Sequence, residues 1–172
     1  MDHATKRYGS FRTLAKFALI LVSIVVAQGI LSLKFQVFSY FDLPLIYSVY
    51  YGFTLARPSG SIAIGSVVGL MQDSLSGAAL GMNGFTKTLI GFLAASAGSK
   101  FDVEQPITRV LALVLFTFLD LALKGLLSIL VSSDTSAVAG PALGFWVLSS
   151  IFNALFGLIL FGYRSRFVHV AA

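Results

Sequence analysis

Residues 107–131 read ITRVLALVLFTFLDLALKGLLSILV, an apolar stretch long enough to cross a bilayer as one helix. A helix needs about 20 apolar residues to cross a hydrocarbon core of about 30 Å. Two further stretches, residues 14–33 and 140–163, meet the same requirement. The sequence therefore predicts three clear membrane-spanning helices.

The composition also indicates a protein that lies mostly in lipid. Of the 172 residues, 57% are hydrophobic and 11% are charged, and the mean hydropathy is +0.90. A typical soluble domain has about 25% charged residues. We interpret residues 1–172 as a single membrane domain without a separate soluble catalytic unit. The chain has no cysteine, which excludes disulfides and thiolate chemistry.

Three shorter apolar segments follow the first span, at residues 38–56, 61–77 and 82–98. Proline and glycine separate them at residues 57–60 and 77–81, which predicts turns there. The apolar part of the second segment, residues 43–56, reaches only about 21 Å as a helix, so this segment begins earlier, thins the bilayer or spans it in part. The predicted fold class is an all-α integral membrane protein, a bundle of about six transmembrane helices. The alternative is a re-entrant pair formed by the third and fourth segments.

Lysine and arginine set the predicted orientation. With the N-terminus inside, the basic residues in the tails, in the loops and at the ends of the spans divide nine to one in favour of the cytoplasmic side. The nine are Lys6, Arg7, Arg12, Lys16, Arg57, Lys100, Arg109, Arg164 and Arg166, and the one outside is Lys34. This distribution predicts that the N- and C-termini are both cytoplasmic. The net charge of +5 then reflects loops that face anionic membrane lipid, and we expect no nucleic-acid binding.

Four charged side chains fall inside the predicted spans and away from their cytoplasmic ends: Asp73, Lys87, Asp120 and Lys124. Each costs at least about 2.5–3.5 kcal/mol near the centre of a membrane helix, so each needs a partner, water or a function. Asp120 and Lys124 are four residues apart with the acid first, which predicts an ion pair on one helix face. Asp73 and Lys87 lie at similar distances from the turn before Gly81, so we expect a second pair. The rise per residue places all four in the outer half of the membrane, as one intramembrane charge cluster.

Three roles are open for this cluster. The simplest is two ion pairs that fix helix register and hold the bundle together. The second is a pocket that binds a partner or a ligand, and the third is a proton or ion relay. A relay also requires polar groups that lead to the inner face, and the sequence offers few of them.

Small residues recur every four positions around Asp73. Gly65, Gly69, Gly77 and Gly81, with Asp73 completing the period, form a stripe on one helix face. Small residues at this spacing let a second helix backbone approach closely. The stripe is a candidate surface either for partner binding or for helix packing within the same bundle. It is no phosphate-binding loop, because the Lys-Ser/Thr pair of such a loop is missing.

An aromatic stretch leads from the first span into the second: Phe35, Phe38, Tyr40, Phe41, Tyr47, Tyr50 and Tyr51. Aromatic side chains concentrate at membrane interfaces, and they also anchor partner proteins. We interpret the stretch as an interfacial belt, with a docking surface for a partner helix as the alternative.

The sequence contains no constellation typical of catalysis or metal binding. His3 and His169 lie in the two tails, and Asp102 and Glu104 share a loop with Lys100, where they balance local charge. No carboxylate and histidine set recurs at metal-ligand spacing within the predicted spans. We therefore expect no catalytic residues, no metal and no cofactor, and we predict that the protein is not an enzyme.

The order of these features resembles one bacterial family. The features are a short basic tail and first span, Phe41-Asp42-Leu43-Pro44-Leu45, a Gly-x-x-Gly-Leu-x-x-Asp-type core at residues 65–73, and Leu75-Ser76-Gly77-Ala78-Ala79-Leu80-Gly81. In this order, and in length and number of spans, the chain resembles the rod shape-determining protein MreD family. The resemblance is strongest over residues 42–101 and rests on hydropathy alone after residue 107.

The resemblance implies a non-enzymatic, multi-pass protein of the bacterial inner (cytoplasmic) membrane that takes part in cell elongation. Members of the family are thought to bind the bitopic scaffold protein MreC. Through it they are thought to connect MreB filaments with the wall synthase RodA and its penicillin-binding transpeptidase. On this interpretation the protein helps to determine rod shape by organising peptidoglycan synthesis. The resemblance assigns no residue to these contacts.

The alternative function is that of a transporter subunit. The membrane domain is similar in size and span number to the substrate-binding subunits of energy-coupling-factor vitamin transporters, which hold a small molecule near the outer face. The predicted charge cluster in the outer half suits that role. Apart from residues 33–42, however, the outer loops are short and offer few residues to close over a ligand.

Overall fold

The computed structural model describes residues 22–32, 34–55, 57–76, 79–100, 105–132 and 143–168, and every regular element among them is helical. In chain order these elements are Val22–Ser32, which we call the leading helix, the 3₁₀ helix η1 (Gln36–Tyr40), α2 (Leu43–Leu55), α3 (Pro58–Ser76), α4 (Met82–Gly98), α5 (Pro106–Ser132) and α7 (Leu143–Val168). The predicted all-α class is confirmed for this part of the chain. Residues 14–21 and 33 of the predicted first span, and residues 140–142 of the predicted last span, lie outside it.

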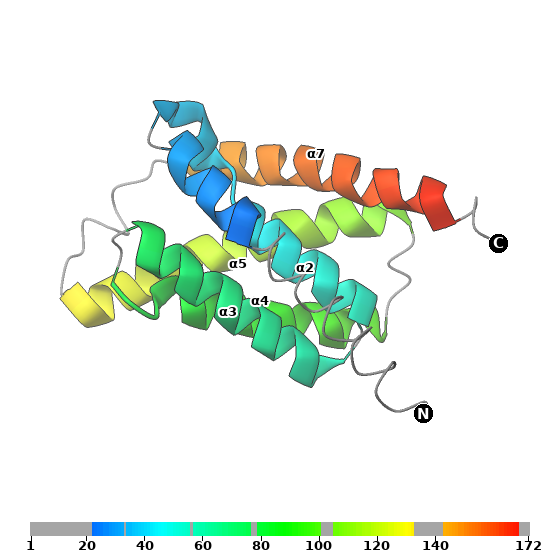
Figure 1. The fold of residues 1–172 in the computed structure, drawn as a ribbon, viewed down its shortest axis with the longest axis horizontal. Coiled ribbons are helices and arrows are strands. Elements are labelled where there is room, and N and C mark those ends of the chain that lie inside the picture. Colours follow the sequence, from blue (N-terminus) through cyan, green and yellow to red (C-terminus); the bar gives the residue numbers. More distant parts are fainter. Residues whose placement is uncertain are drawn as a thin grey trace, which may run out of the picture.

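The helices pack in two groups. α3 and α4 lie side by side, α2 packs against both, and α5 pairs with α7 (Figure 1). Contacts between α4 and α5 join the two groups. The main apolar core lies at this junction and contains Leu45, Ile46, Val49 and Phe53 of α2, Ile90 and Ala94 of α4, and Leu113 and Phe116 of α5. The leading helix joins the bundle where Val25 packs with Val68 of α3.

Proline lies in the first turn of three helices. Pro58 and Pro106 are the first residues of α3 and α5, and Pro44 is the second residue of α2. Proline is tolerated there because the first N–H groups of a helix have no partner within it. The predicted turn at residues 57–60 is therefore too long, since most of it forms the first turn of α3.

The second apolar segment does not begin as an α-helix. The 3₁₀ helix η1 occupies its predicted start, and α2 begins only at Leu43. Aromatic rings attach this region to α7, with centroid distances of 5.0 Å for Tyr40–Phe145 and 4.9 Å for Phe41–Phe152. Such pairs add about 0.5–1.5 kcal/mol beyond the area they bury. These two members of the predicted aromatic belt therefore pack within the protein.

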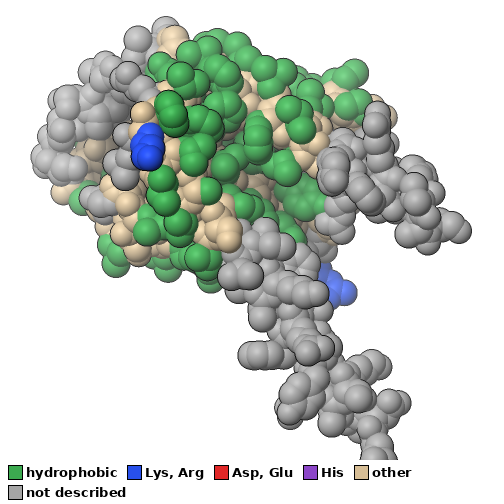
Figure 2. All heavy atoms as spheres, turned by 45° about the horizontal axis from the view of Figure 1, so that its top comes forward, with side chains coloured by type: hydrophobic (Ala, Val, Ile, Leu, Met, Phe, Trp, Pro, Cys, Tyr) green, Lys and Arg blue, Asp and Glu red, His purple; other side chains and the backbone are tan. Residues whose placement is uncertain are grey.

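The distribution of polarity is the reverse of that in a soluble protein. Polar and charged side chains are buried: Ser48, Ser61, Asp73, Asn83, Thr86, Lys87, Thr117, Asp120, Ser149, Ser150 and Asn153. Large apolar side chains are exposed on every long helix, and on α5 and α7 they include Ile107, Leu111, Leu115, Leu126, Leu130, Ile151, Leu155 and Ile159. Figure 2 shows one face on which hydrophobic side chains cover much of the described surface. A lipid environment favours this arrangement, because buried charges are paired and the outer surface needs no water.

Among the described helices, α5 alone is both long and apolar enough to cross a membrane, over Pro106–Val131. Val22–Ser32 and Gly144–Leu160 are apolar but shorter. The structure thus gives one helix that meets the criterion by itself, within a bundle whose outer surface is apolar.

Candidate functional site

Four charged side chains meet in the interior and form a closed ring of ion pairs. Lys87 Nζ lies 2.7 Å from Asp42 Oδ2 and 3.2 Å from Asp120 Oδ1. Lys124 Nζ lies 3.1 Å from Asp42 Oδ2 and 2.6 Å from Asp120 Oδ2. Each cation therefore contacts both anions, and the formal charges cancel. We call these four residues the charge ring.

Three separate parts of the chain supply the charge ring. Asp42 directly precedes α2, Lys87 belongs to α4, and Asp120 and Lys124 lie one turn apart on α5. The side chains of Lys87 and Asp120 are 0% and 2% exposed, whereas those of Asp42 and Lys124 are 14% and 24% exposed. Removing one partner of a buried pair costs about 3–5 kcal/mol, because it leaves an uncompensated charge. The ring therefore fixes the positions of α2, α4 and α5 relative to one another.

Asp42 also caps α2. Its Oδ1 accepts a hydrogen bond from the N–H of Leu45 at 3.0 Å, the geometry of an N-cap residue. Its own N–H donates to Asn153 Oδ1 of α7 at 2.9 Å, and the next N–H, of Leu43, donates to Gln28 Oε1 of the leading helix at 2.7 Å. The backbone at this point is thus attached to two other helices, which holds the Asp42 carboxylate in place for both lysines.

Asp73 forms a second polar centre, at the start of α4. Its Oδ2 accepts from the N–H groups of Gly81 and Gly84 at 2.9 and 3.0 Å. Its Oδ1 accepts from both the backbone N–H and the side-chain amide of Asn83, each at 2.9 Å. The first N–H groups of a helix have no partner within it and favour a nearby negative charge. Asp73 therefore joins the end of α3 to the start of α4.

The turn before α4 depends on glycine. Gly81 has a φ of +97°, in the left-handed region that glycine adopts without steric cost. A Cβ at this position would meet no atom within 4 Å, so the requirement is one of backbone conformation rather than of space.

Asn83 connects the two polar centres. Its side-chain amide donates to Asp73, and its Oδ1 lies 3.5 Å from Lys87 Nζ. At the other side of the ring, Asn153 Nδ2 donates to Thr117 Oγ1 of α5 at 3.3 Å. A continuous polar network therefore runs from Asp73 through the charge ring to α7. The four residues of the predicted cluster all belong to this network.

The glycines of the predicted stripe do not share one surface. A Cβ at Gly65 or Gly69 would overlap backbone carbonyl oxygens of α4, so these two glycines face α4. Gly81 lies in the turn, after α3 has ended, and Gly77 falls outside the residues that the structure describes. Gly65 and Gly69 thus allow close packing of α3 on α4 within the bundle.

Of the two predicted ion pairs, the structure contains one. The Asp120–Lys124 ion pair is confirmed, whereas the expected Asp73–Lys87 pair is not formed, because Asp73 binds amides and Lys87 binds two other carboxylates. Sequence reasoning missed Asp42 as a member of the cluster. A signal was present, because an acidic residue two positions before a proline, at the start of an apolar run, is typical of a helix N-cap.

The charged groups of this network bind one another and hold helices in place. Every charged group in the ring is paired with groups of opposite charge from the same chain. Among the residues that the structure describes, no three acidic or histidine side chains are placed to hold a metal ion. The arrangement therefore stabilises the bundle and offers no unpaired charge to a substrate.

One comparison with known proteins identifies a relationship. A family model described as rod shape-determining protein MreD matches residues 9–167, nearly the whole chain. No curated protein and no solved structure gave a significant match.

Proposed function

The chain belongs to the family of the rod shape-determining protein MreD, and on this premise we propose that it is a non-enzymatic membrane scaffold of the bacterial cell-elongation machinery. It binds the bitopic protein MreC and thereby couples the MreB cytoskeleton to peptidoglycan synthesis by RodA and its penicillin-binding transpeptidase. The family match over residues 9–167 is the observation that carries the proposal.

We further propose that the chain crosses the inner membrane six times, with both termini cytoplasmic. α3 has 19 residues and α4 has 17, so each reaches about 25–28 Å at 1.5 Å per residue. Lengths of this size support two complete crossings rather than a re-entrant pair. The excess of lysine and arginine in alternate loops supports the orientation.

The internal pairing of charges supports a scaffold over a carrier of small molecules. A vitamin carrier needs a pocket of about 300–1,000 Å³ with polar groups left free for the ligand. Two cavities found among the described residues measure about 70 and 240 Å³, and the charge ring borders neither. The larger one has an almost wholly apolar lining: Phe53, Ala97, Thr108, Leu111, Ala112, Leu115 and Phe116. We therefore favour the scaffold over the transporter subunit.

Depletion of the protein in its own host tests this proposal. We expect depleted cells to round up, and an affinity-tagged copy to recover MreC together with the wall synthase. A tagged Arg57→Gln variant is the matched control, because Arg57 is exposed directly before α3 and belongs to none of the ion pairs of the charge ring. Unchanged cell shape, together with recovery of an ATPase pair or a bound vitamin, would overturn the proposal in favour of the transporter.

A further inference from the structure

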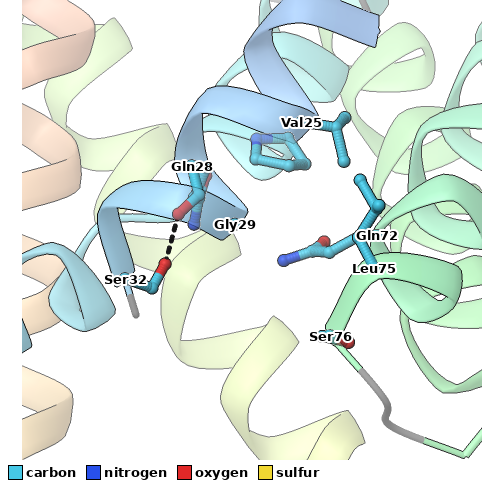
Figure 3. Close-up of a pocket in the computed structure, with 8 residues that line it drawn as sticks. Val25, Gln28, Gly29, Ser32, Gln72, Leu75 and Ser76 are labelled. Carbon is cyan, nitrogen blue, oxygen red and sulfur yellow. Dashed lines mark hydrogen bonds between the residues drawn. The ribbon is translucent and has the colours of Figure 1, made fainter. Parts of the chain in front are cut away.

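A narrow cavity lies between the leading helix and α3, apart from the charge ring (Figure 3). Its volume is about 70 Å³. It is lined by Val25, Gln28, Gly29, Ser32, Pro44, Gln72, Leu75 and Ser76. A cavity of this size admits about two water molecules or one small side chain, and it is too small for a metabolite. We call it the notch.

Gln72 brings an unsatisfied polar group to the notch. Its side chain projects from α3 into the gap (Figure 3), and its Oε1 is buried without a hydrogen-bond partner. Gln28, on the opposite wall, is already engaged, because its Oε1 accepts from Leu43 N–H and its Nε2 donates to the carbonyl of Phe41. The Ser32 hydroxyl donates to the carbonyl of Gln28. A buried carbonyl without a donor costs about 1–3 kcal/mol, so Gln72 favours a donor that the described part of the chain does not supply.

The surface around the notch allows a helix to approach closely and to insert one side chain. Gly29 lines it, and a Cβ at Gly29 would have no atom within 4 Å, so the backbone of the leading helix is uncovered there. Leu75, which lines the notch on α3, is 51% exposed. Membrane helices approach closely at such small residues and bind one another through hydroxyl and amide groups. Lipid acyl chains carry no donor and leave the Gln72 carbonyl unsatisfied.

We propose that the notch is the docking site for the membrane helix of a bitopic partner. That helix inserts one hydroxyl- or amide-bearing side chain, which donates a hydrogen bond to Gln72, while its backbone lies along Gly29. The apolar rim at Leu75 packs against the apolar side chains of the same helix. The inference rests on the proposed function, because it names the surface through which this scaffold takes its bitopic partner.

Co-purification of tagged variants with co-expressed MreC tests the notch. Gly29→Leu fills it, and Gln72→Leu removes the acceptor. Gly144→Leu on α7 is the matched control, because a Cβ there also has no atom within 4 Å. We expect both notch variants to recover about tenfold less MreC, which corresponds to about 1.4 kcal/mol of binding free energy. The control and wild type should recover equal amounts, and all four proteins should keep the same melting temperature in detergent.

Cysteine cross-linking gives a second, independent measurement. Since the chain has no cysteine, Leu75→Cys introduces a single thiol at the notch, and Leu155→Cys introduces one on the exposed face of α7. Single cysteines are then placed in turn along the membrane helix of MreC. We expect disulfides from Leu75→Cys at MreC positions that recur every three to four residues, and none from Leu155→Cys.

The outcomes separate the notch from the proposed function. If wild type recovers MreC and the notch variants recover as much, the notch is not the docking site, although the proposed function stands. The same holds if Leu75→Cys cross-links to a second copy of this chain, or if Gln72→Leu lowers only the melting temperature, as for a site that holds water alone. If wild type itself recovers no MreC and depleted cells keep their shape, the proposed function fails and the inference fails with it.

Discussion

At the scale of single residues, Lys87 depends on its neighbours because it is a charged side chain without exposure to solvent. It is fully buried, and its ammonium group lies within 3.2 Å of two carboxylates from other elements. A lysine in lipid is tolerated only when it is paired in this way. Asp42 and Asp120 depend on it in return, because each carboxylate shares its negative charge between two cations.

The first prediction concerns this lysine. Lys87→Met keeps a long side chain but removes the charge, so Asp42 and Asp120 are left with one cation between them. We expect the free energy of unfolding to fall by about 3–5 kcal/mol, measured by thermal or denaturant unfolding of the purified protein in detergent. Lys124→Met is the control, and it should cost less because Lys124 is 24% exposed. An equal fall in the free energy of unfolding for the two variants would contradict the idea that the more deeply buried lysine contributes more to stability.

A second prediction concerns Asp73. Asp73→Leu removes the acceptor of four hydrogen bonds at the start of α4, at a cost of at least about 3 kcal/mol. We expect cells that carry only this variant to lose rod shape and to contain less of the protein, as scored by microscopy and immunoblotting. Arg57→Gln should preserve both. Normal rod growth with the Asp73 variant as the sole copy would defeat this prediction.

The sequence predicted local residue relationships better than distant ones. The Asp120–Lys124 pair follows from a four-residue spacing on one helix, which the helix itself fixes. The contact of Lys87 with Asp42 joins residues that are 45 positions apart, and no periodicity encodes it. The expected Asp73–Lys87 pair is not formed for a local reason. Asp73 accepts hydrogen bonds from the N–H groups at the start of α4 instead.

At the scale of elements, glycine allows the close packing of α3 on α4. Cβ atoms at Gly65 and Gly69 would overlap the carbonyl oxygens of Lys87 and Asn83. Because Lys87 and Asn83 are also members of the polar network, the distance between the two helices decides whether that network can form.

A third prediction follows from this contact. Gly65→Ala and Gly69→Ala force α3 away from α4, and we expect each to lower the free energy of unfolding by about 1–3 kcal/mol, the usual cost of overpacking. Gly144→Ala should leave stability the same or raise it, because its Cβ meets no atom and alanine favours a helix. The measurement is the melting temperature of the three variants in detergent. An unchanged value for both α3 variants would show that the helices tolerate a wider separation.

Hydropathy predicted the bounds of α4 and α5 well. The predicted segments 82–98 and 107–131 agree with α4 and α5 to within a residue or two, because a turn or a proline starts each of them. The apolar part of the second segment, residues 43–56, also begins where α2 begins, whereas the longer segment from residue 38 starts too early, because residues 36–40 form η1. Asp42 caps α2 at this boundary, and the rings of Tyr40 and Phe41 contact α7, a tertiary interaction that hydropathy does not encode.

At the scale of the whole molecule, apolar side chains lie on the outside and charges on the inside. Hydropathy predicts this arrangement, but it does not predict which side of the membrane each end of the bundle faces. The distribution of basic residues supplies that information and leads to a fourth prediction.

Single-cysteine labelling of intact cells measures the orientation. Leu80→Cys lies between α3 and α4, where the side chain is 79% exposed, and we expect a membrane-impermeant maleimide to label it from outside. Ser59→Cys and Ser99→Cys, at the opposite ends of these helices, should react only after the inner membrane is permeabilised. The chain without cysteine is the blank. The reverse labelling pattern would place both termini outside and contradict the orientation proposed from the basic residues.

The charge ring also has a consequence for the order in which the protein is made. Asp42 is synthesised first and Lys87 second, so the earliest buried anion meets a cation as soon as α4 enters the bilayer. Asp120 and Lys124 arrive later on a single helix that already carries its own counter-charge. No helix of the ring therefore has to wait in lipid with a lone charge until the chain is finished. The order of these residues along the chain thus suits helices that enter the membrane one after another as the chain is synthesised.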